Sequence, residues 1–231
     1  MKPTLTTSAS DPFAVLKMMT RVVDGQVAGF VSPPEITGIG VDFDPVPTQV
    51  SEDVGLIVES SGSTGRPKRI EISLAALIAS ANASAKFLGG HGQWLLALPA
   101  NYIAGANVLF RSVVADTQPV IQNTRVPFSA EGFLNSVSLM RGGKRYTSLV
   151  PAQLDRLAAL IDLESQDSGI IAALQSFDAI LIGGQLPNPA TLESLKSRGV
   201  KLVESYGMAE TSGGCVYDGQ ALEGVNLEII D

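Results

Sequence analysis

The sequence has few of the residues on which several classes of protein depend. It contains one cysteine, one histidine and one tryptophan, and aromatic residues make up 6% of its 231 positions. A single cysteine, Cys215, excludes an internal disulfide framework and fits a reducing cytoplasm, the compartment that we expect. The histidine, His91, lies in a Gly-Gly-His-Gly segment before a strand, so we expect it to be exposed and not catalytic.

Long apolar runs and an excess of positive charge are also missing. No stretch reaches the roughly 18 apolar residues of a membrane span, and residues 1–7 lack the apolar core of a signal peptide. Lys and Arg number 16 against 23 Asp and Glu, which gives a net charge of −7. This balance argues against nucleic acid as a partner, because phosphate binding needs a basic surface. It leaves room for a local basic pocket.

What the sequence does contain is an alternation of strand and helix patterns from Val54 onward. Several strand candidates are continuously apolar, as in a sheet covered on both faces. The alternation predicts an α/β fold with mostly parallel sheets flanked by helices. We expect strands at 54–58, 94–98, 119–122, 145–150, 177–182 and 200–204, and helices at 73–88, 103–115, 129–141, 151–161 and 187–198.

Residues 1–51 show little periodicity, and we expect an irregular lead-in with one short helix at 12–23. Four prolines between residues 32 and 51 indicate a surface connection. In an α/β fold, ligands bind at the loops that follow the carboxyl ends of the strands. The search for a functional site therefore starts at those loops.

The stretch 60–68, Ser-Ser-Gly-Ser-Thr-Gly-Arg-Pro-Lys, follows the strand at 54–58 and precedes the helix at 73–88. Glycines let backbone N–H groups turn toward a ligand, hydroxyls donate hydrogen bonds and Lys68 adds a positive charge, a composition that suits an anion. The P-loop pattern does not apply, because Lys68 follows proline instead of glycine. The alternative is an ordinary polar turn.

Three further strand-end segments are unusual: Gly183-Gly184-Gln185, Ser205 to Thr211, and Pro99 to Gly105. Paired glycines allow a flat ligand to approach the backbone closely, although they also occur in ordinary turns. Tyr206 could be a core aromatic, but its glycine neighbour favours a ring that lines a pocket. Glu210 and Thr211 offer a carboxylate for Mg²⁺ and a hydroxyl for phosphate.

Taken in order, these segments resemble the adenylate-forming superfamily, the acyl-CoA synthetases and their relatives. The stretch 61–68 is similar to its phosphate loop, Tyr206-Gly207-Met208-Ala209-Glu210-Thr211 to its Tyr-Gly-x-x-Glu-Thr motif, and Gly183-Gly184-Gln185 to its adenine loop. Arg69 departs from the usual glycine at that position. The resemblance implies ATP and Mg²⁺ as cofactors and CoA as a second substrate. It also implies that the substrate carboxylate is the nucleophile, so Cys215 is expected to be a small buried side chain.

The resemblance also implies roles for individual residues. Thr64, Lys68, Glu210 and Thr211 would be catalytic, with Glu210 holding Mg²⁺. Tyr206 would stack on the adenine. The implied ATP-binding residues are Ser60, Ser61, Gly62, Ser63, Thr64, Gly65, Lys68, Gly183, Gly184, Gln185, Tyr206, Gly207, Met208 and Thr211.

Within that superfamily, two segments resemble the o-succinylbenzoate–CoA ligases of menaquinone synthesis: 98–105 with Arg111 and Ser112, and 147–154. An arginine at the spacing of Arg111 from Gly105 helps those ligases to hold a substrate carboxylate. The acid would therefore contact Asn101, Arg111 and Gly207. Arg111 could instead be solvated or cap its helix. Asn101 stands where the family often has histidine, which leaves the shape of the acyl pocket open.

Family members continue for over a hundred residues beyond this point, so we expect residues 1–231 to form a partial N-terminal AMP-binding domain without the small C-terminal lid domain. Two alternatives remain: another acyl- or aryl-CoA ligase, or a nucleotide- or acyl-binding module without catalysis. The expected partners are a small carboxylic acid, ATP and CoA. The sequence does not determine the oligomeric state.

Overall fold

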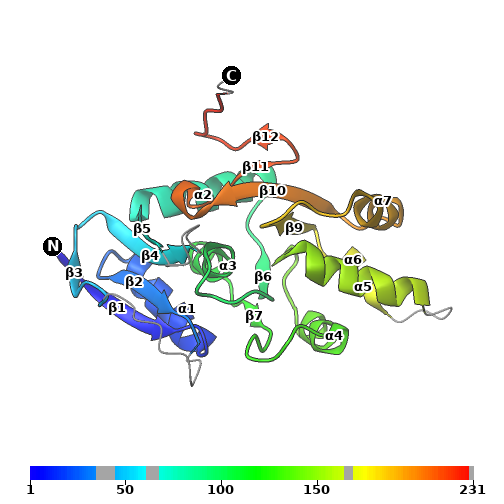
Figure 1. The fold of residues 1–231 in the computed structure, drawn as a ribbon, viewed down its shortest axis with the longest axis horizontal. Coiled ribbons are helices and arrows are strands. Elements are labelled where there is room, and N and C mark those ends of the chain that lie inside the picture. The colour runs from blue at the N-terminus through cyan, green and yellow to red at the C-terminus, as the bar shows by residue number, and fades with distance from the viewer. Residues whose placement is uncertain (35–44, 61–67, 164–168, 229–231) are drawn as a thin grey trace.

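The computed structural model describes residues 1–34, 45–60, 68–163 and 169–228, which form two β-sheets with helices between and beside them (Figure 1). The strands are β1 (Lys2–Ser8), β2 (Ala28–Ser32), β3 (Gln49–Val50), β4 (Val54–Ser60), β5 (Lys68–Ser73), β6 (Gln93–Leu96), β7 (Val120–Ile121), β8 (Arg145–Leu149), β9 (Ala179–Gly183), β10 (Leu202–Met208), β11 (Gly213–Tyr217) and β12 (Gln220–Ala221). The helices are α1 (Pro12–Val23), α2 (Leu74–Phe87), α3 (Ile103–Val114), α4 (Ala130–Ser138), α5 (Pro151–Leu163), α6 (Ile170–Gln175) and α7 (Pro189–Ser197), with a 3₁₀ turn, η1, at Ala209–Thr211.

The smaller sheet has five strands in the order β3-β1-β2-β4-β5. Strands β1, β2 and β4 run parallel, and β3 and β5 are antiparallel edges. The larger sheet has seven strands in the order β12-β11-β10-β9-β8-β6-β7. Its strands from β7 to β10 are parallel, whereas β11 and β12 are antiparallel. The predicted α/β fold with mostly parallel sheets is therefore confirmed.

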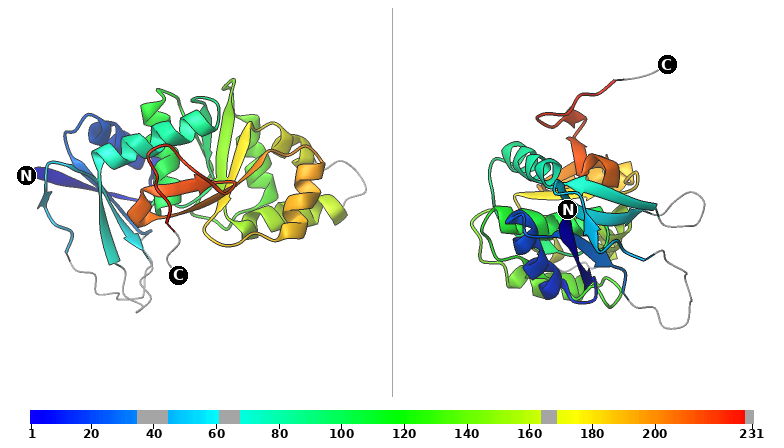
Figure 2. Two further views of the ribbon diagram at one scale, coloured as in Figure 1. Left: turned by 90° about the horizontal axis from the view of Figure 1, so that it is seen from above. Right: turned by 90° about the vertical axis from the view of Figure 1, so that its left-hand side faces the viewer.

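Helices α1, α2 and α3 lie between the two sheets, and α4 to α7 cover the far face of the larger one (Figures 1 and 2). The apolar side chains form two large core clusters, one between the sheets and one under α4 to α7, and a small third cluster on the other face of the smaller sheet. Helix α3 contacts α1, β6, β8 and β11. Its central residues from Ala106 to Ser112 are all buried, because the helix has neighbours on every side.

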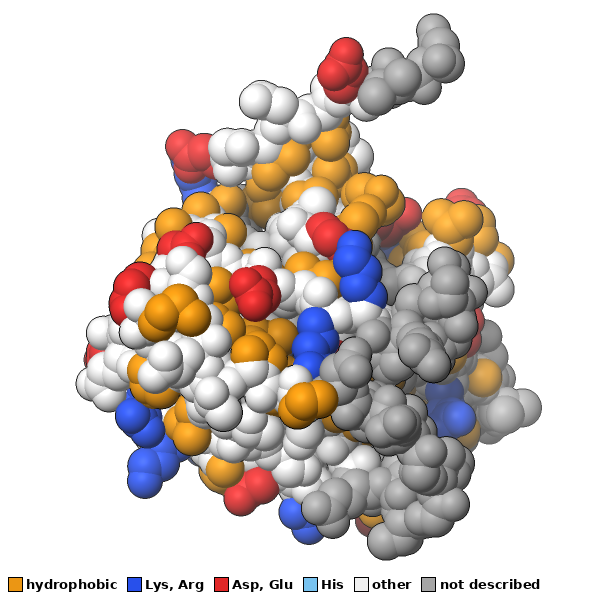
Figure 3. All heavy atoms as spheres, turned by 60° about the vertical axis from the view of Figure 1, so that its left-hand side comes forward, with side chains coloured by type: hydrophobic (Ala, Val, Ile, Leu, Met, Phe, Trp, Pro, Cys, Tyr) orange, Lys and Arg blue, Asp and Glu red, His pale blue; other side chains and the backbone are white. Residues whose placement is uncertain are grey.

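The surface fits the acidic composition. Acidic and basic side chains are interspersed with apolar ones on the face shown in Figure 3. His91 is exposed and Cys215 is a free, buried thiol, as expected from the sequence. No helix among the described residues is long and apolar enough to cross a membrane.

The irregular lead-in expected for residues 1–51 is wrong. Strands β1 and β2 pair with each other and β2 pairs with β4, so the first part of the chain forms most of the smaller sheet. The sequence signal is weak because Thr4, Thr6 and Thr7 carry polar side chains, although threonine favours strands. The helix expected at 12–23 is confirmed, with Asp11 capping it by accepting from the Ala14 N–H at 3.0 Å.

Two segments that the sequence analysis placed in strand-to-helix or strand-end loops, 60–68 and 205–211, have other neighbours in the structure. Strand β5 follows residues 61–67 and pairs antiparallel with β4, so the stretch 60–68 joins two strands and not a strand and a helix. The burial of Ile70 and Ile72 beside outward Arg69 and Glu71 is the alternation of a strand. Strand β10 continues to Met208, which places Tyr206 and Gly207 within a strand and not in a loop after it.

Candidate active site

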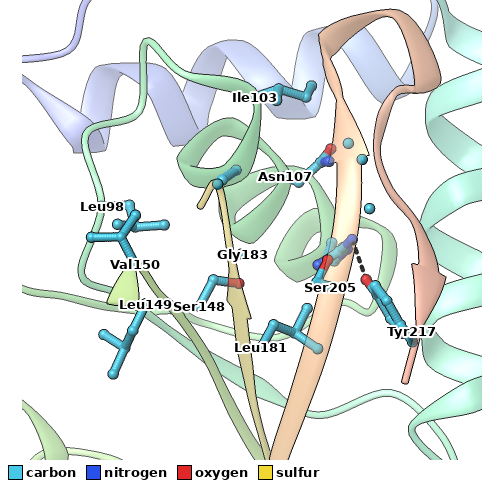
Figure 4. Close-up of a pocket in the computed structure, with 16 residues that line it drawn as sticks. Leu98, Ile103, Asn107, Ser148, Leu149, Val150, Leu181, Gly183, Ser205 and Tyr217 are labelled. Carbon is cyan, nitrogen blue, oxygen red and sulfur yellow. Dashed lines mark hydrogen bonds between the residues drawn. The ribbon is translucent and has the colours of Figure 1, made fainter. Parts of the chain in front are cut away.

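A cavity of about 130 Å³ lies where β6, β8 and β9 end and where β10 passes from its pairing with β9 to its pairing with β11 (Figure 4). This is the edge at which an α/β fold is expected to bind its ligand. One wall is a stripe along α3 that includes Ile103, Asn107 and Arg111. Their spacing of four residues places the three side chains on one face of the helix.

The opposite side of the cavity is largely backbone, because two glycines bring strands together there. A Cβ on Gly207 would lie 2.0 Å from the Gly213 carbonyl oxygen, and a Cβ on Gly183 would lie 2.6 Å from that of Ser205. Real side chains do not tolerate either distance. Gly183, Gly184 and Gly207, which the sequence analysis selected, all line the cavity.

Arg111 is the one charged side chain on the cavity wall among the described residues. It is 6% exposed, and its Nη2 donates hydrogen bonds to Ser84 Oγ at 3.0 Å and Tyr217 Oη at 3.1 Å. Its guanidinium carbon lies 5.1 Å from the centre of the Trp94 ring, a cation–π contact. Its Nε is buried without a hydrogen-bond partner.

No carboxylate among the described residues forms an ion pair with Arg111. Buried charges in proteins are normally paired, because removing an ion from water without compensation is costly. Two hydroxyls and an aromatic ring compensate in part. A buried guanidinium that lines a cavity and lacks a counter-ion therefore points to an anionic ligand.

Asn107 connects the wall of the cavity with the turn after η1. It is 4% exposed, and its Nδ2 donates to the Ser212 carbonyl oxygen at 2.9 Å. Ser212 and Gly213 both have positive φ angles, 59° and 96°, where the chain turns back from η1 into β11. The hydrogen bond thus fixes α3 against the segment that carries Glu210 and Thr211.

A second group of expected residues meets outside the cavity. Lys68 Nζ, at the start of β5, lies 3.8 Å from Glu210 Oε1 in η1, although the two are far apart in sequence. Both side chains are exposed, so this ion pair adds little to stability. The Thr211 hydroxyl accepts from the Met208 N–H at 2.9 Å and lies 2.7 Å from the Gly213 carbonyl oxygen, to which it donates.

Glu210 is the candidate metal ligand. The described residues contain no group of three or more His, Cys, Asp or Glu side chains that could form a metal site on their own. Mg²⁺ in nucleotide enzymes is usually held by one or two carboxylates together with substrate phosphates, so one exposed carboxylate fits such an ion. Lys68 beside it suits a phosphate that carries the metal.

The structure does not bring every expected residue to the cavity. Ser61, Gly62, Ser63, Thr64 and Gly65 lie outside the described residues, and Ser60 Oγ donates to the Lys68 carbonyl oxygen at 3.4 Å. Tyr206 and Met208 are 61% and 44% exposed and do not line the cavity. Gln185 is exposed, and it does not line the cavity either. The pocket-lining ring expected of Tyr206 is therefore not seen at this cavity.

Asn101 is also absent from the cavity wall. It is 7% exposed, it lies in the turn before α3, and its Oδ1 is buried without a hydrogen-bond partner. The cavity contains other residues that the sequence analysis did not select: Asn107, Ser148, Ser205 and Tyr217. Asn107 could have been found from its spacing to Arg111, and Ser148 from its place at a strand end. Nothing in the sequence marks Tyr217.

The comparison with known families agrees with this geometry. A family described as "AMP-binding enzyme" matches residues 6–228. The chain therefore belongs to the AMP-binding enzyme family. It is 41% identical over 216 residues to a probable 2-succinylbenzoate–CoA ligase of Mycobacterium tuberculosis, covering 94% of this chain and 55% of that protein. It is 35% identical over 162 residues to the 2-succinylbenzoate–CoA ligase of Bacillus licheniformis, covering 69% of this chain and 31% of that protein.

Solved structures show the same relationship. The o-succinylbenzoate coenzyme A synthetase (MenE) of Bacillus subtilis in complex with AMP is 28% identical, with a TM-score of 0.57 over 71% of this chain and 32% of that chain. Its unliganded form superimposes with a TM-score of 0.66 over 94% of this chain, at 19% identity, which supports the fold alone. The chain spans about half the length of the Mycobacterium relative.

Proposed function

We propose that this chain is the AMP-binding part of an acid–CoA ligase that activates o-succinylbenzoate with ATP and transfers the acyl group to CoA. The observation that carries the proposal is Arg111, a buried guanidinium on the cavity wall with no carboxylate partner among the described residues. The names of the relatives support the choice of acid. The single free cysteine fits a cytoplasmic enzyme.

The first step needs groups that position the reactants and neutralise charge. A substrate carboxylate attacks the α-phosphorus of ATP and pyrophosphate leaves, so the protein has little covalent role. Lys68 and the hydroxyls of 60–65 would hold the leaving phosphates. Glu210 would hold Mg²⁺, which would supply positive charge to neutralise the phosphates, and Thr211 would contact the phosphate that becomes the adenylate.

The nucleotide would lie along β9 and β10. Gly183 and Gly184 leave the backbone open to the adenine, with Gln185 beside them, and the exposed ring of Tyr206 would stack on it. Gly207 and Met208 continue this surface toward η1. Such a path brings the α-phosphate to the mouth of the cavity that holds the acid.

The acid would enter between α3 and the ends of β8 and β9. One of its carboxylates stays near Thr211 for reaction, and the other pairs with Arg111. The arginine fork can meet a carboxylate with two N–H groups, which lysine cannot do. Leu98, Leu149 and Val150 supply apolar contacts for an aromatic ring. Asn101 does not line this cavity, so the proposal gives it no contact with the acid.

Binding of the acid tests the proposal on this chain without catalysis. The affinity for o-succinylbenzoate should be compared with that for two monocarboxylic analogues, each lacking one acid group. Losing one partner of a desolvated charge pair costs about 2–5 kcal/mol, or roughly 30- to several-thousand-fold in affinity. We expect wild type to bind the diacid at least about 30-fold more tightly than the analogue that lacks the acid group paired with Arg111. The Arg111→Ala variant should bind the diacid and that analogue alike.

The Arg111→Lys variant separates charge from geometry, and we expect an intermediate preference. If Arg111→Ala causes no loss of affinity for one analogue, the acid group that this analogue lacks is the one that Arg111 contacts. A wild-type chain that binds all three acids equally would overturn the proposal of a diacid, and would favour another acyl- or aryl-CoA ligase.

A further inference from the structure

Two hydroxyl side chains hold the Arg111 guanidinium from elements that are distant in the sequence. Ser84 lies in α2 and Tyr217 in β11, and both are 0% exposed. Their hydroxyl oxygens are 3.0 Å apart and each accepts a hydrogen bond from Arg111 Nη2. The dashed line that ends at the Tyr217 hydroxyl in Figure 4 marks one of these bonds.

This arrangement restricts how the guanidinium can turn. Both hydroxyls contact the same nitrogen, Nη2, and the Trp94 ring lies against the guanidinium at 5.1 Å. An arginine side chain carries considerable rotamer entropy, which binding must otherwise remove. Fixing the plane before the ligand arrives presents the remaining N–H groups of the guanidinium to an anion in one orientation.

Tyr217 is itself held in place. The edge of its ring meets Phe87 of α2 at 5.3 Å between ring centres and an interplanar angle of 84°. A Cβ on Gly214 would lie 2.7 Å from Tyr217 Cε1, so the ring occupies the space that a side chain at 214 would need. The position of the hydroxyl is therefore set by packing and not only by its hydrogen bonds.

We propose that Ser84 and Tyr217 are positioning residues that fix Arg111 for recognition of the second carboxylate of the acid. The inference rests on the proposed function, because it assumes that Arg111 binds that carboxylate. It assigns a role to two residues that need not touch the reacting atoms. They act through the geometry of the guanidinium, so their removal should reduce diacid recognition while its positive charge remains.

The variants Ser84→Ala and Tyr217→Phe each remove one hydroxyl. Ser84→Ala places the residue with the best helix propensity in α2, so it should fold. Matched controls are Ser112→Ala, whose buried hydroxyl donates to Val108 O at 2.9 Å, and Tyr146→Phe, whose hydroxyl donates to backbone carbonyls. Neither control hydroxyl contacts Arg111. Calorimetry gives the affinities, and fluorescence of the single tryptophan, Trp94, reports on occupancy beside the guanidinium.

We expect each hydroxyl deletion to weaken o-succinylbenzoate binding roughly five- to tenfold. This is less than the roughly thirteenfold or more of a full hydrogen bond to a charged group, because the other hydroxyl still holds Nη2. Binding of the monocarboxylic analogue that lacks the second acid should change less than twofold, and the controls should resemble wild type. In an Arg111→Ala background the same deletions should have no further effect on the diacid, because a positioning residue acts through Arg111.

The outcomes separate this inference from the proposed function. If wild type shows no preference for the diacid, the proposed function fails and this inference fails with it. If wild type prefers the diacid and both deletions keep the full preference, only the positioning role is overturned. Equal losses on diacid and monoacid, or losses that persist without Arg111, would also overturn it, because they indicate a structural role.

Discussion

Arg111 and Tyr146 show two ways in which this protein accommodates a buried polar side chain. The Tyr146 hydroxyl donates to the carbonyl oxygens of Leu88 at 3.1 Å and Gly90 at 3.0 Å, so its hydrogen-bonding capacity is used within the fold. Arg111 lines a cavity, and its buried Nε has no hydrogen-bond partner. A satisfied side chain contributes to stability, whereas an unsatisfied one at a cavity indicates a ligand.

The first prediction concerns Tyr146. Burial, with a further contribution from Asp178, raises the pKa of the Tyr146 hydroxyl above its ordinary value of 10.0. Because the folded state favours the neutral phenol, this contribution to stability is present below pH 10 and is lost as the pH rises through the folded pKa. We therefore expect the difference in unfolding free energy between wild type and Tyr146→Phe to narrow above pH 10.

Urea unfolding from pH 8 to pH 11 measures this difference. Tyr102→Phe is the matched control, because it also removes one tyrosine hydroxyl but at a position that is 54% exposed. If the difference in unfolding free energy between wild type and Tyr146→Phe stays constant or widens above pH 10, the pKa of the Tyr146 hydroxyl is not raised by folding.

Single residues also show what the sequence could and could not reveal about the site. Arg111 could be selected because it stands at the spacing from Gly105 that is found in the ligases the sequence resembles. Its apolar neighbours Leu109 and Phe110 also place its stem near the core. Tyr217 could not, because its contact with Arg111 depends on how β11 packs against α2 and α3. No local pattern encodes a contact between residues that distant in sequence.

At the level of elements, the hairpin of β4 and β5 gives residues 61–67 a setting different from the one expected. It places Lys68, at the start of the edge strand β5, beside Glu210 of the Glu-Thr motif. Four apolar residues among the five from Val54 to Val58 made β4 easy to predict. The two-residue alternation of β5 was present in the sequence, but its shortness hid it beside the stronger helical pattern of α2.

The second prediction follows from the ion pair between Lys68 of β5 and Glu210 of η1. Removing the Glu210 charge with Glu210→Gln should weaken ATP binding about tenfold when Mg²⁺ is present, because the metal would lose the carboxylate that we propose holds it. When EDTA removes the metal, wild type and variant should bind ATP equally. Calorimetry with and without Mg²⁺ checks both statements.

Glu223→Gln is the matched control for this experiment. Glu223 is also exposed and ion-paired, with Lys86 at 3.0 Å, but it does not lie at η1. A loss in Glu210→Gln that is the same with and without Mg²⁺ would show that Glu210 does not hold the metal.

The third prediction concerns the bulge where β10 pairs with β11. The register shifts between Tyr206 and Gly207, and a Cβ at 207 would meet the Gly213 backbone at 2.0 Å. Backbone atoms cannot yield as a flexible side chain does, so Gly207→Ala should destabilise the fold by about 1–3 kcal/mol, the usual range for overpacking. It should also distort the wall of the cavity.

Thermal unfolding and acid binding together measure these effects. Gly143→Ala is the control, because a Cβ at 143 meets nothing within 4 Å. If Gly207→Ala is as stable as Gly143→Ala and binds the diacid like wild type, the close approach of β10 and β11 is not a constraint.

On the scale of the whole molecule, the larger sheet joins the two core clusters. Successive side chains of a strand point to opposite faces. In β6, Trp94 and Leu96 belong to the cluster between the sheets, and Leu95 belongs to the cluster under α4 to α7. Strand β9 divides in the same way, with Leu181 on one side and Ile180 on the other. Neither cluster can be lost without exposing one face of these strands.

The alternation of strands and helices in the sequence was enough to predict this architecture, because each βα unit has its own periodicity. The smaller sheet was not predicted, since β1, β2 and β4 are brought together only in the tertiary structure. Short strands with polar residues are stabilised by their neighbours more than by their own propensity.

The last prediction tests the coupling between the clusters. Phe133 of α4 is 0% exposed and lies in the cluster away from Trp94. Phe133→Ala should destabilise the protein by about 3–5 kcal/mol, the usual cost of such a cavity. Because the shared strands link the clusters, the urea midpoints from Trp94 fluorescence and from far-UV circular dichroism should fall together, as in one cooperative transition. Phe13→Ala, at a 69% exposed position, should leave both unchanged. A Trp94 midpoint that stays at the wild-type value while the dichroism becomes biphasic would show that the clusters unfold separately.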